Sequence, residues 1–149
     1  MYCTRQFYLS LAIIVSSTLL FAADGPQKPS IVLIMADDMG YSDLGCFGGE
    51  IRTPHLDRLA TGGLRFTNFY SENMCWVSRA AMLTGVNHRT SLGGGAIHPR
   101  CPTLAELLHD AGYQTRMSGK WHLAGNRDSV YPNDRGFEEF YGIRGGPAS

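Results

Sequence analysis

The chain has 149 residues, which is enough for one domain with a hydrophobic core. Apolar residues make up 44% and charged residues 17%, so the composition excludes an intrinsically disordered protein. Lysine plus arginine equals aspartate plus glutamate, at 13 each, so no excess of positive charge favours nucleic acid as a partner.

Residues 1–23 have the layout of a secretory signal peptide. Arg5 precedes an apolar run from Phe7 to Phe21, and two small residues, Ala22 and Ala23, follow it. The run is shorter than the roughly 20 residues that a membrane-spanning helix requires, so we expect cleavage and no stable membrane span. The expected protein is therefore exported, to a periplasm, a lysosome-like lumen or the exterior, with its domain at residues 24–149.

Cleavage after residue 23 would remove Cys3 and leave Cys46, Cys75 and Cys101. An odd number of cysteines in an exported protein leaves at least one thiol unpaired or chemically altered. A bridge between Cys46 and Cys101 is compatible with the sequence, but spacing alone does not establish it.

The domain begins with an apolar segment that ends in two acids. Residues 31–36 (IVLIMA) predict a buried strand, and Asp37 and Asp38 follow it directly. Two adjacent carboxylates favour a hard divalent cation such as Ca²⁺ or Mg²⁺. A solvated turn or a helix N-cap is the simpler interpretation of this pair taken alone.

Alternating helix and strand signals continue along the chain and predict an α/β domain with a mainly parallel sheet flanked by helices. Capping residues and glycines mark the helix ends, and aromatic or β-branched runs mark the strands. The expected elements are a helix from Thr53 to Gly62, a strand over 64–70, a helix over 78–84, a flexible loop at 93–95, a helix from Thr103 to Gly112 with Glu106 completing a capping box, and a strand over 114–117.

Three positions could carry chemistry at the ends of these elements. Cys75 lies where the helix over 78–84 is about to begin, a position that favours anions, and Arg79 follows one helical turn later. Lys120 and His122 flank Trp121, and in an extended segment both would lie on one face, where a lysine can bind an anion and a histidine can move a proton. Taken singly, each fits an ordinary buried cysteine, a surface lysine or a structural histidine.

Five segments occur in an order that is far more specific than any single motif: IVLIMADDMGYSDLGCFGG, IRTPHLDRLATGGLRFTNFYS, CWVSRAAMLTG, TLAELLHDAGYQTRMSGKWHLAG and DRGFEEFYG. With them the chain resembles the N-terminal part of the sulfatase family, in the alkaline-phosphatase-like superfamily. The resemblance covers about residues 29–142 and implies part of an alkaline-phosphatase-like layered α/β domain, here truncated.

The resemblance also implies roles for individual residues. Cys75 would be oxidised to formylglycine by a maturation enzyme, and the hydrated aldehyde would attack the sulfur of a sulfate ester, aryl or glycan. Asp37, Asp38 and the modified Cys75 would bind Ca²⁺, or Mg²⁺. Arg79 would hold the formylglycine, Lys120 would bind the nucleophile and the sulfate, and His122 would contact the substrate group and assist sulfate release.

Two features depart from the family pattern. Position 77 is valine where the family has proline, which bears on the modification of Cys75, although valine also permits an extended segment. The chain ends at Ser149, whereas sulfatases run for several hundred residues, so we expect an incomplete catalytic domain. A non-catalytic remnant and a phosphate or phosphonate monoester hydrolase of the same superfamily therefore stay as alternatives to a sulfatase.

The remaining polar and aromatic candidates are assigned to structure. Tyr41 and Asp43 are expected to shape the loop after the paired acids, and Trp121 is expected to pack beside the site. The other histidines are expected at structural or surface positions: His55, His88, His98 and His109.

Overall fold

A computed structural model describes residues 27–125 and 130–146 of the chain. The chain divides into two units, Met1–Met35 and Ala36–Ser149, and every candidate site residue belongs to the second unit. The predicted signal peptide at residues 1–23 lies outside the described residues. Within the described ranges, no helix combines the length and the apolar character that crossing a membrane requires.

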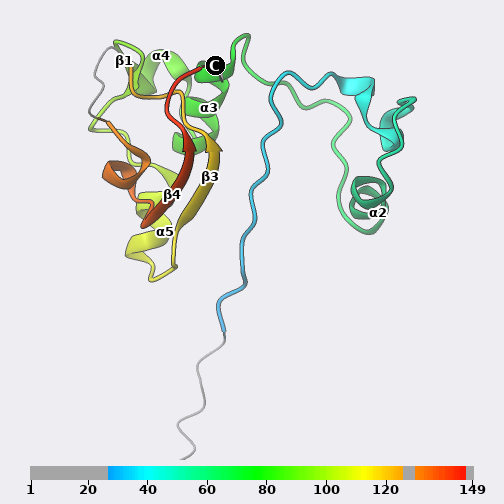
Figure 1. Cartoon of the computed structure of the whole chain (residues 1–149), viewed down its shortest axis with the longest axis horizontal. Coiled ribbons are helices and arrows are strands. Elements are labelled where there is room, and N and C mark those ends of the chain that lie inside the picture. The colour runs from blue at the N-terminus through cyan, green and yellow to red at the C-terminus, as the bar shows by residue number, and fades with distance from the viewer. Residues whose placement is uncertain (1–26, 126–129, 147–149) are drawn as a thin grey trace, which may run out of the picture. The chain divides into compact units, whose positions relative to one another are not determined.

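The second unit contains both helices and short strands, and the predicted α/β class is confirmed (Figure 1). The parallel pair of strands, β3 and β4, runs in register from Arg116 opposite Glu139 to Lys120 opposite Ile143. The elements in chain order are η2 (Tyr41–Asp43), η3 (Gly45–Phe47), α2 (Pro54–Gly62), α3 (Cys75–Thr84), α4 (His88–Ser91), β1 (Leu92–Gly93), β2 (Ala96–Ile97), α5 (Leu104–Asp110), β3 (Arg116–Lys120), η4 (Pro132–Arg135) and β4 (Glu139–Ile143).

The three predicted helices form, two of them at the starts that their capping residues indicate. α2 starts after Thr53 with Pro54 in its first turn, and α5 starts after Thr103 with the expected capping box to Glu106. α3 ends at Gly85, whose φ of 67° is in the left-handed region that glycine adopts without steric cost. It begins at Cys75, three residues before the predicted start at Ser78.

Two predicted strands do not form. Residues 31–36 and 64–70 carry no strand, and apart from the half-buried Met35 their residues are exposed, with Ile34 at 75% and Leu64 at 81%. Among the described residues neither segment has a neighbouring strand to bond with. An apolar, β-prone run becomes a strand only when a partner accepts and donates its backbone hydrogen bonds, so the prediction of two buried strands was wrong here.

The glycine segment 93–95 is a tight turn rather than the flexible loop that was expected. β1 and β2 pair antiparallel, with Gly93 opposite Ala96, and the turn between them contains only Gly94 and Gly95. Both have positive φ, 62° and 82°, as a two-residue hairpin turn of the I′ type requires.

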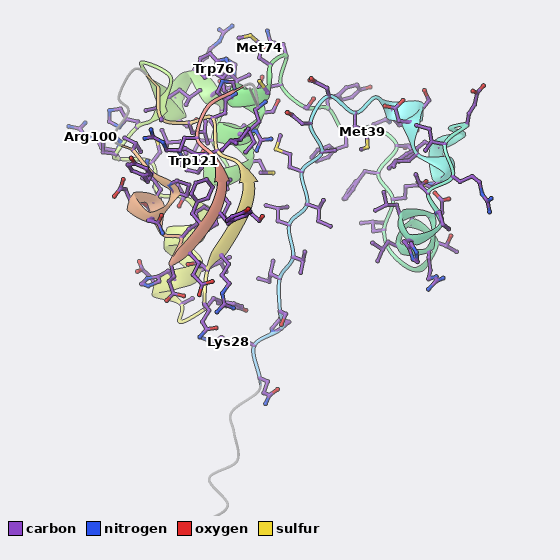
Figure 2. The ribbon with its side chains drawn as sticks, in the orientation of Figure 1. Lys28, Met39, Met74, Trp76, Arg100 and Trp121 are labelled. Carbon is purple, nitrogen blue, oxygen red and sulfur yellow. The ribbon has the colours of Figure 1, made fainter. Side chains whose placement is uncertain are left out.

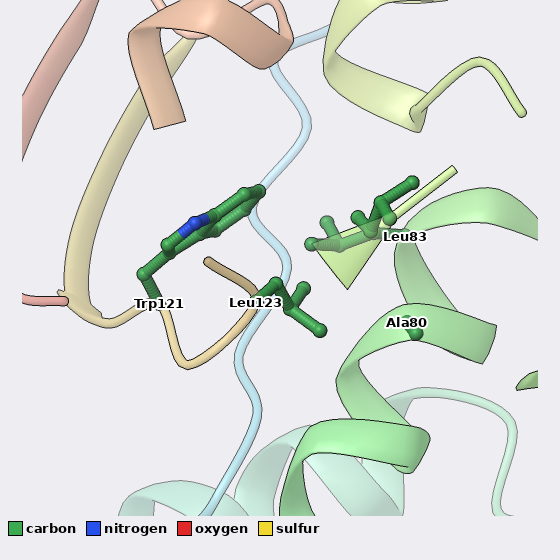
Figure 3. Close-up of a cluster of buried hydrophobic side chains, with 5 residues drawn as sticks. Ala80, Leu83, Trp121 and Leu123 are labelled. Carbon is green, nitrogen blue, oxygen red and sulfur yellow. The ribbon is translucent and has the colours of Figure 1, made fainter. Parts of the chain in front are cut away.

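A compact apolar core lies between α3 and the segment that follows β3. Trp121 and Leu123 are fully buried, and they face Ala80 and Leu83 of α3 (Figure 3). The indole N–H of Trp121 donates to the carbonyl of Val130 at 3.2 Å, so its burial leaves no polar atom unsatisfied. Figure 2 shows this side chain inside the ribbon, while Met74 and Trp76 mark the start of α3. The expected packing role of Trp121 is confirmed.

A buried arginine joins α5 to η4. Arg135, which is 7% exposed, donates from Nε to Glu106 at 2.8 Å and from Nη2 to the carbonyl of Cys101 at 2.6 Å. Thr103, the cap of α5, donates its hydroxyl proton to the carbonyl of Arg135 at 2.8 Å. Partial burial raises the pKa of Glu106, but the hydrogen bonds from Arg135 and Thr103 outweigh it, so the pKa of this carboxyl is lowered overall.

We expect Glu106→Gln to destabilise the protein by about 1.5–3 kcal/mol at pH 7, because charged hydrogen bonds to Arg135 and Thr103 weaken. A lowered folded-state pKa means that ionised Glu106 stabilises the fold above its ordinary pKa of 4.5, and that this contribution is lost as pH falls through the folded value. Urea unfolding followed by tryptophan fluorescence at pH 7 and at pH 3 should therefore show a difference that shrinks in acid.

Glu139→Gln is the matched control for this experiment. Glu139 pairs with Arg116 at 2.9 Å, but both side chains are more than half exposed, at 67% and 60%. An exposed pair contributes about 0–1 kcal/mol, so this substitution should change little at either pH. Equal effects of the two substitutions would contradict the role assigned to Glu106.

Candidate active site

Cys75 is the first residue of α3, and the hydroxyl of Ser78 anchors the chain that leads into it. That hydroxyl donates to the carbonyls of Met74 and Glu72, at 2.9 and 3.1 Å. The carboxylate of Glu72 in turn lies 3.1 Å from Nδ1 of His88 at the start of α4. The residues before Cys75 are therefore tied to two helices, which sets the position of its side chain at the helix end.

Arg79 lies one turn after Cys75 and is 7% exposed. Its Nη1 donates to the carbonyl of Lys120 at 2.6 Å, and its Nη2 lies 3.6 Å from Oδ1 of Asp37, an ion-pair contact longer than a hydrogen bond. Its Nε has no hydrogen-bond partner among the described residues although it is buried. The guanidinium thus joins the helix of Cys75 to the end of β3 and faces a carboxylate.

Asp37 receives a second cation from the end of β3. Lys120 Nζ donates to Oδ2 of Asp37 at 2.8 Å, and the lysine side chain is only 15% exposed. The hydrogen bond from Lys120 lowers the pKa of Asp37, helped by the charges of Lys120 and Arg79 and opposed by desolvation. Asp37 is therefore ionised at neutral pH, and it pairs with the two cations that sequence analysis assigned to the site.

His122 contacts the thiol of Cys75, with 3.4 Å between Nδ1 and Sγ. Burial lowers the pKa of His122, the charges of Lys120 and Arg79 lower it further, and Asp37 opposes them. The neutral imidazole is thereby favoured, so the ring can accept a proton at the position of residue 75.

The backbone around Lys120 is not the extended segment that was expected. Gly119 has φ of 108° and His122 has φ of 56°, so the chain turns on both sides of Trp121. The expectation that Lys120 and His122 share one face of a strand was wrong, yet the turn directs both side chains into the same site, one to Asp37 and one to Cys75.

Backbone strain within the described ranges coincides with the candidate site. Asp38 and His122, with φ of 54° and 56°, are the two described residues other than glycine that have positive φ. A left-handed conformation costs an L-residue about 1–2 kcal/mol, so it persists only where neighbouring structure imposes it. Both residues were predicted as site residues from the sequence on other grounds, and backbone strain concentrates at functional sites.

The remaining candidates stay outside this contact network. Asp43 accepts a hydrogen bond from the amide of Gly40 at 2.7 Å, and the Tyr41 ring packs 4.5 Å from that of Phe47, so both shape the loop after the paired acids. Cys46 and Cys101 are free thiols, and the bridge considered between them is absent in this structure. Among the other histidines, His88 is half-buried and lies against Glu72. The remaining three are exposed: His55, His98 and His109.

The donors at the site fit a divalent metal ion in type but not in number. Carboxylate oxygens of Asp37 and Asp38 are the type that Ca²⁺ and Mg²⁺ prefer. In the part of the chain that the structure describes, however, no three His, Cys, Asp or Glu side chains come together as a metal site. These two acids are therefore suitable in chemistry but supply only part of the six or more oxygens that Ca²⁺ takes.

Two of the site's supports were not predicted from the sequence. Gly119, with φ of 108°, permits the turn that presents Lys120, and Glu72 holds the start of α3 through its carbonyl. Gly119 could have been detected, because a glycine directly before a charged residue at a strand end is a recognisable sequence signal. Nothing in the sequence pattern indicates that a backbone carbonyl six residues away accepts the Ser78 proton.

The chain is similar to known proteins of one family. The sequence profile of the family described as Sulfatase matches residues 29–148. Human arylsulfatase A is 46% identical over 129 residues, covering 78% of this chain and 25% of that protein. The arylsulfatase of Klebsiella aerogenes is 38% identical over 157 residues, covering 94% and 34%. The dog N-acetylgalactosamine-6-sulfatase is 41% identical over 150 residues, covering 89% and 28%.

Solved structures agree with the sequence comparison. The crystal structure of Ps i-CgsB matches with a TM-score of 0.72 at 38% identity, over 80% of this chain and 29% of that one. The same protein in complex with k-i-k-neocarrahexaose matches with a TM-score of 0.72 at 37% identity, again over 80% and 29%. The chain thus spans about a quarter to a third of each of these relatives, and it belongs to the sulfatase family.

Proposed function

We propose that this chain contributes the nucleophile side of the active site of a sulfuric ester hydrolase. The observation that carries the proposal is the contact network that links Cys75 to His122, and Arg79 and Lys120 to Asp37. Membership of the sulfatase family, with relatives named as arylsulfatases and an N-acetylgalactosamine-6-sulfatase, supports the type of reaction.

Each residue has a role that its surroundings permit. Formylglycine made from Cys75 would supply, when hydrated, an oxygen nucleophile at the start of α3. Arg79 and Lys120 place two cations beside it, which would bind the anionic sulfate group and neutralise charge that develops there. His122, favoured as the neutral imidazole, would take up or return a proton at the side chain of residue 75.

Asp37 and Asp38 would hold the divalent cation that sulfatases require by resemblance, Ca²⁺ or Mg²⁺. Such an ion would supply Lewis acidity and would make the hydroxyl of the nucleophile more acidic. In this structure Lys120 and Arg79 balance the charge of Asp37. We propose that these lysine and arginine contacts keep the acid ionised and in place.

The proposed substrate is a sulfate ester of an aryl alcohol or a glycan. Arylsulfatases and a hexosamine sulfatase occur among the relatives, and one related structure holds k-i-k-neocarrahexaose. We also propose export directed by residues 1–23, and maturation by a formylglycine-generating enzyme.

A non-catalytic role is the second candidate, and Val77 favours it. The family motif has proline at this position, and valine lacks the fixed φ that holds the segment extended. If Cys75 remained a thiol, sulfate-ester turnover would be small or absent. A phosphate or phosphonate ester hydrolase is the remaining alternative, because two cations beside a nucleophile attract phosphate as well as sulfate.

The protein, produced together with a formylglycine-generating enzyme and supplied with Ca²⁺, is expected to hydrolyse an aryl sulfate faster than the matching aryl phosphate. Lys120→Met should lower kcat/KM for the sulfate by about 100-fold or more, because one stabilising cation is removed from the transition state. Steady-state kinetics with a chromogenic ester measures both effects.

Arg116→Met is the control for Lys120→Met, since the two cations lie at opposite ends of β3 and Arg116 pairs only at the surface with Glu139. It should leave kcat/KM unchanged. A preference for the phosphate ester would support the phosphatase alternative. If Cys75 is fully converted to formylglycine and the protein hydrolyses neither ester, the result would support the non-catalytic alternative.

Val77→Pro is expected to raise the yield of formylglycine at Cys75 while the protein stays folded. Val77 is the third residue of α3, where the amide has no helical carbonyl to bond, so proline removes no helical hydrogen bond. Mass spectrometry of the peptide that contains Cys75 should show a larger fraction about 18 Da lighter, the change from thiol to aldehyde.

Ala80→Pro tests whether α3 tolerates proline only in its first turn. Ala80 is fully buried in the interior of α3, where proline costs about 3 kcal/mol or more, and we expect this variant to unfold at much lower urea concentration. Equal destabilisation by both prolines, or an unchanged yield in Val77→Pro, would count against the interpretation of position 77.

A further inference from the structure

Backbone pairing continues beyond the end of the β3–β4 ladder. The amide of Trp121 donates to the carbonyl of Ile143 at 2.8 Å, and the amide of His122 donates to the carbonyl of Arg144 at 2.9 Å. These two bonds carry the segment after β4 alongside the turn that contains His122. In Figure 1 this red segment runs from β4 past the green helix α3. The next glycines along the chain, Gly145 and Gly146, therefore lie close to the candidate site.

Gly146 packs directly against the imidazole of His122. A Cβ atom added to Gly146 would lie 2.6 Å from Nε2, 2.7 Å from Cε1 and 3.2 Å from Cδ2 of that ring. The first two distances are well inside van der Waals contact. On its other edge the same ring presents Nδ1 to Sγ of Cys75 at 3.4 Å. The imidazole thus lies between residue 146 and residue 75.

We propose that Gly146 is a positioning residue, whose missing side chain lets the imidazole of His122 face residue 75. The backbone of His122 cannot shift readily, because its amide is bonded to Arg144 and its φ of 56° is set by the turn. A methyl group at position 146 must therefore be accommodated by rotation of the ring, which removes Nδ1 from the thiol.

Gly145 provides the contrast within the same segment. A Cβ atom at Gly145 would meet nothing within 4 Å, and its backbone φ lies outside the left-handed range. An alanine at residue 145 therefore removes the same backbone freedom from the unfolded chain without touching the ring. The significance of Gly146 for catalysis rests on the proposed function, whereas its effect on the His122–Cys75 contact does not.

The test measures the reactivity of the thiol in protein whose Cys75 is unmodified. Iodoacetamide alkylation is followed peptide by peptide by mass spectrometry, so that Cys46 and Cys101 serve as internal controls. In Gly146→Ala the rate at Cys75 should fall by about threefold to tenfold, as expected when one hydrogen bond to the reacting group is lost. The rates at Cys46 and Cys101, and all three rates in Gly145→Ala, should stay as in the unaltered protein.

A double-mutant cycle separates positioning from a merely structural role. Asn tolerates the left-handed backbone of residue 122 and lacks the ring that Gly146 contacts. His122→Asn should slow alkylation of Cys75 to a similar extent, and adding Gly146→Ala should produce no further change. Urea unfolding of each variant identifies any loss of folding.

An unchanged rate at Cys75 in folded Gly146→Ala would overturn the proposal. Equal slowing in Gly145→Ala, or additive effects of the two substitutions in the double variant, would overturn it as well. Because the readout is thiol alkylation, absence of sulfatase turnover would count against the proposed function and leave this result standing.

Discussion

The candidate site depends on the contacts that the buried guanidinium of Arg79 makes. It binds the carbonyl of Lys120 at 2.6 Å and lies 3.6 Å from Asp37, while its own helix begins at Cys75. An arginine that is 7% exposed requires such partners, because an unpaired buried charge costs several kcal/mol. Satisfying this one group therefore holds together three segments that are distant in sequence.

Packing of the apolar core next to the site fixes the residues that make these contacts. Trp121 lies between Lys120 and His122 in sequence, and it is fully buried against α3, as is Leu123. The two polar side chains consequently point away from the core and toward Asp37 and Cys75. Packing of the indole thus determines the direction in which the cation and the imidazole face.

The electrostatics of the site follow from this crowding of cations. Lys120 and Arg79 lower the pKa of Asp37. Burial lowers the pKa of His122, and the charges of the same two cations lower it further. An ionised acid and a neutral imidazole are therefore favoured in the same small region. This combination suits the binding of an anionic group beside a residue that can exchange a proton, which agrees with membership of the sulfatase family.

Local signals predicted the helices well. Thr53 with Pro54, and Thr103 with Glu106, mark helix starts through interactions within one turn, so their outcome does not depend on distant residues. Strands depend on partners elsewhere, which is why residues 31–36 and 64–70 fail to form them among the described residues. The glycine turn at 94–95 was misread because its conformation needs the pairing of β1 with β2.

By itself the sequence determined the capped starts of α2 and α5, the α/β class, the family and the identity of the residues that could carry chemistry, because these depend on residue types at short spacings. Only the tertiary structure decided that Asp37 pairs with Lys120 and that His122, in a left-handed turn, faces Cys75. It also decided that Gly146 lies against the imidazole. Such contacts join residues tens of positions apart, and no local pattern specifies which distant atoms a folded backbone brings within a few ångströms.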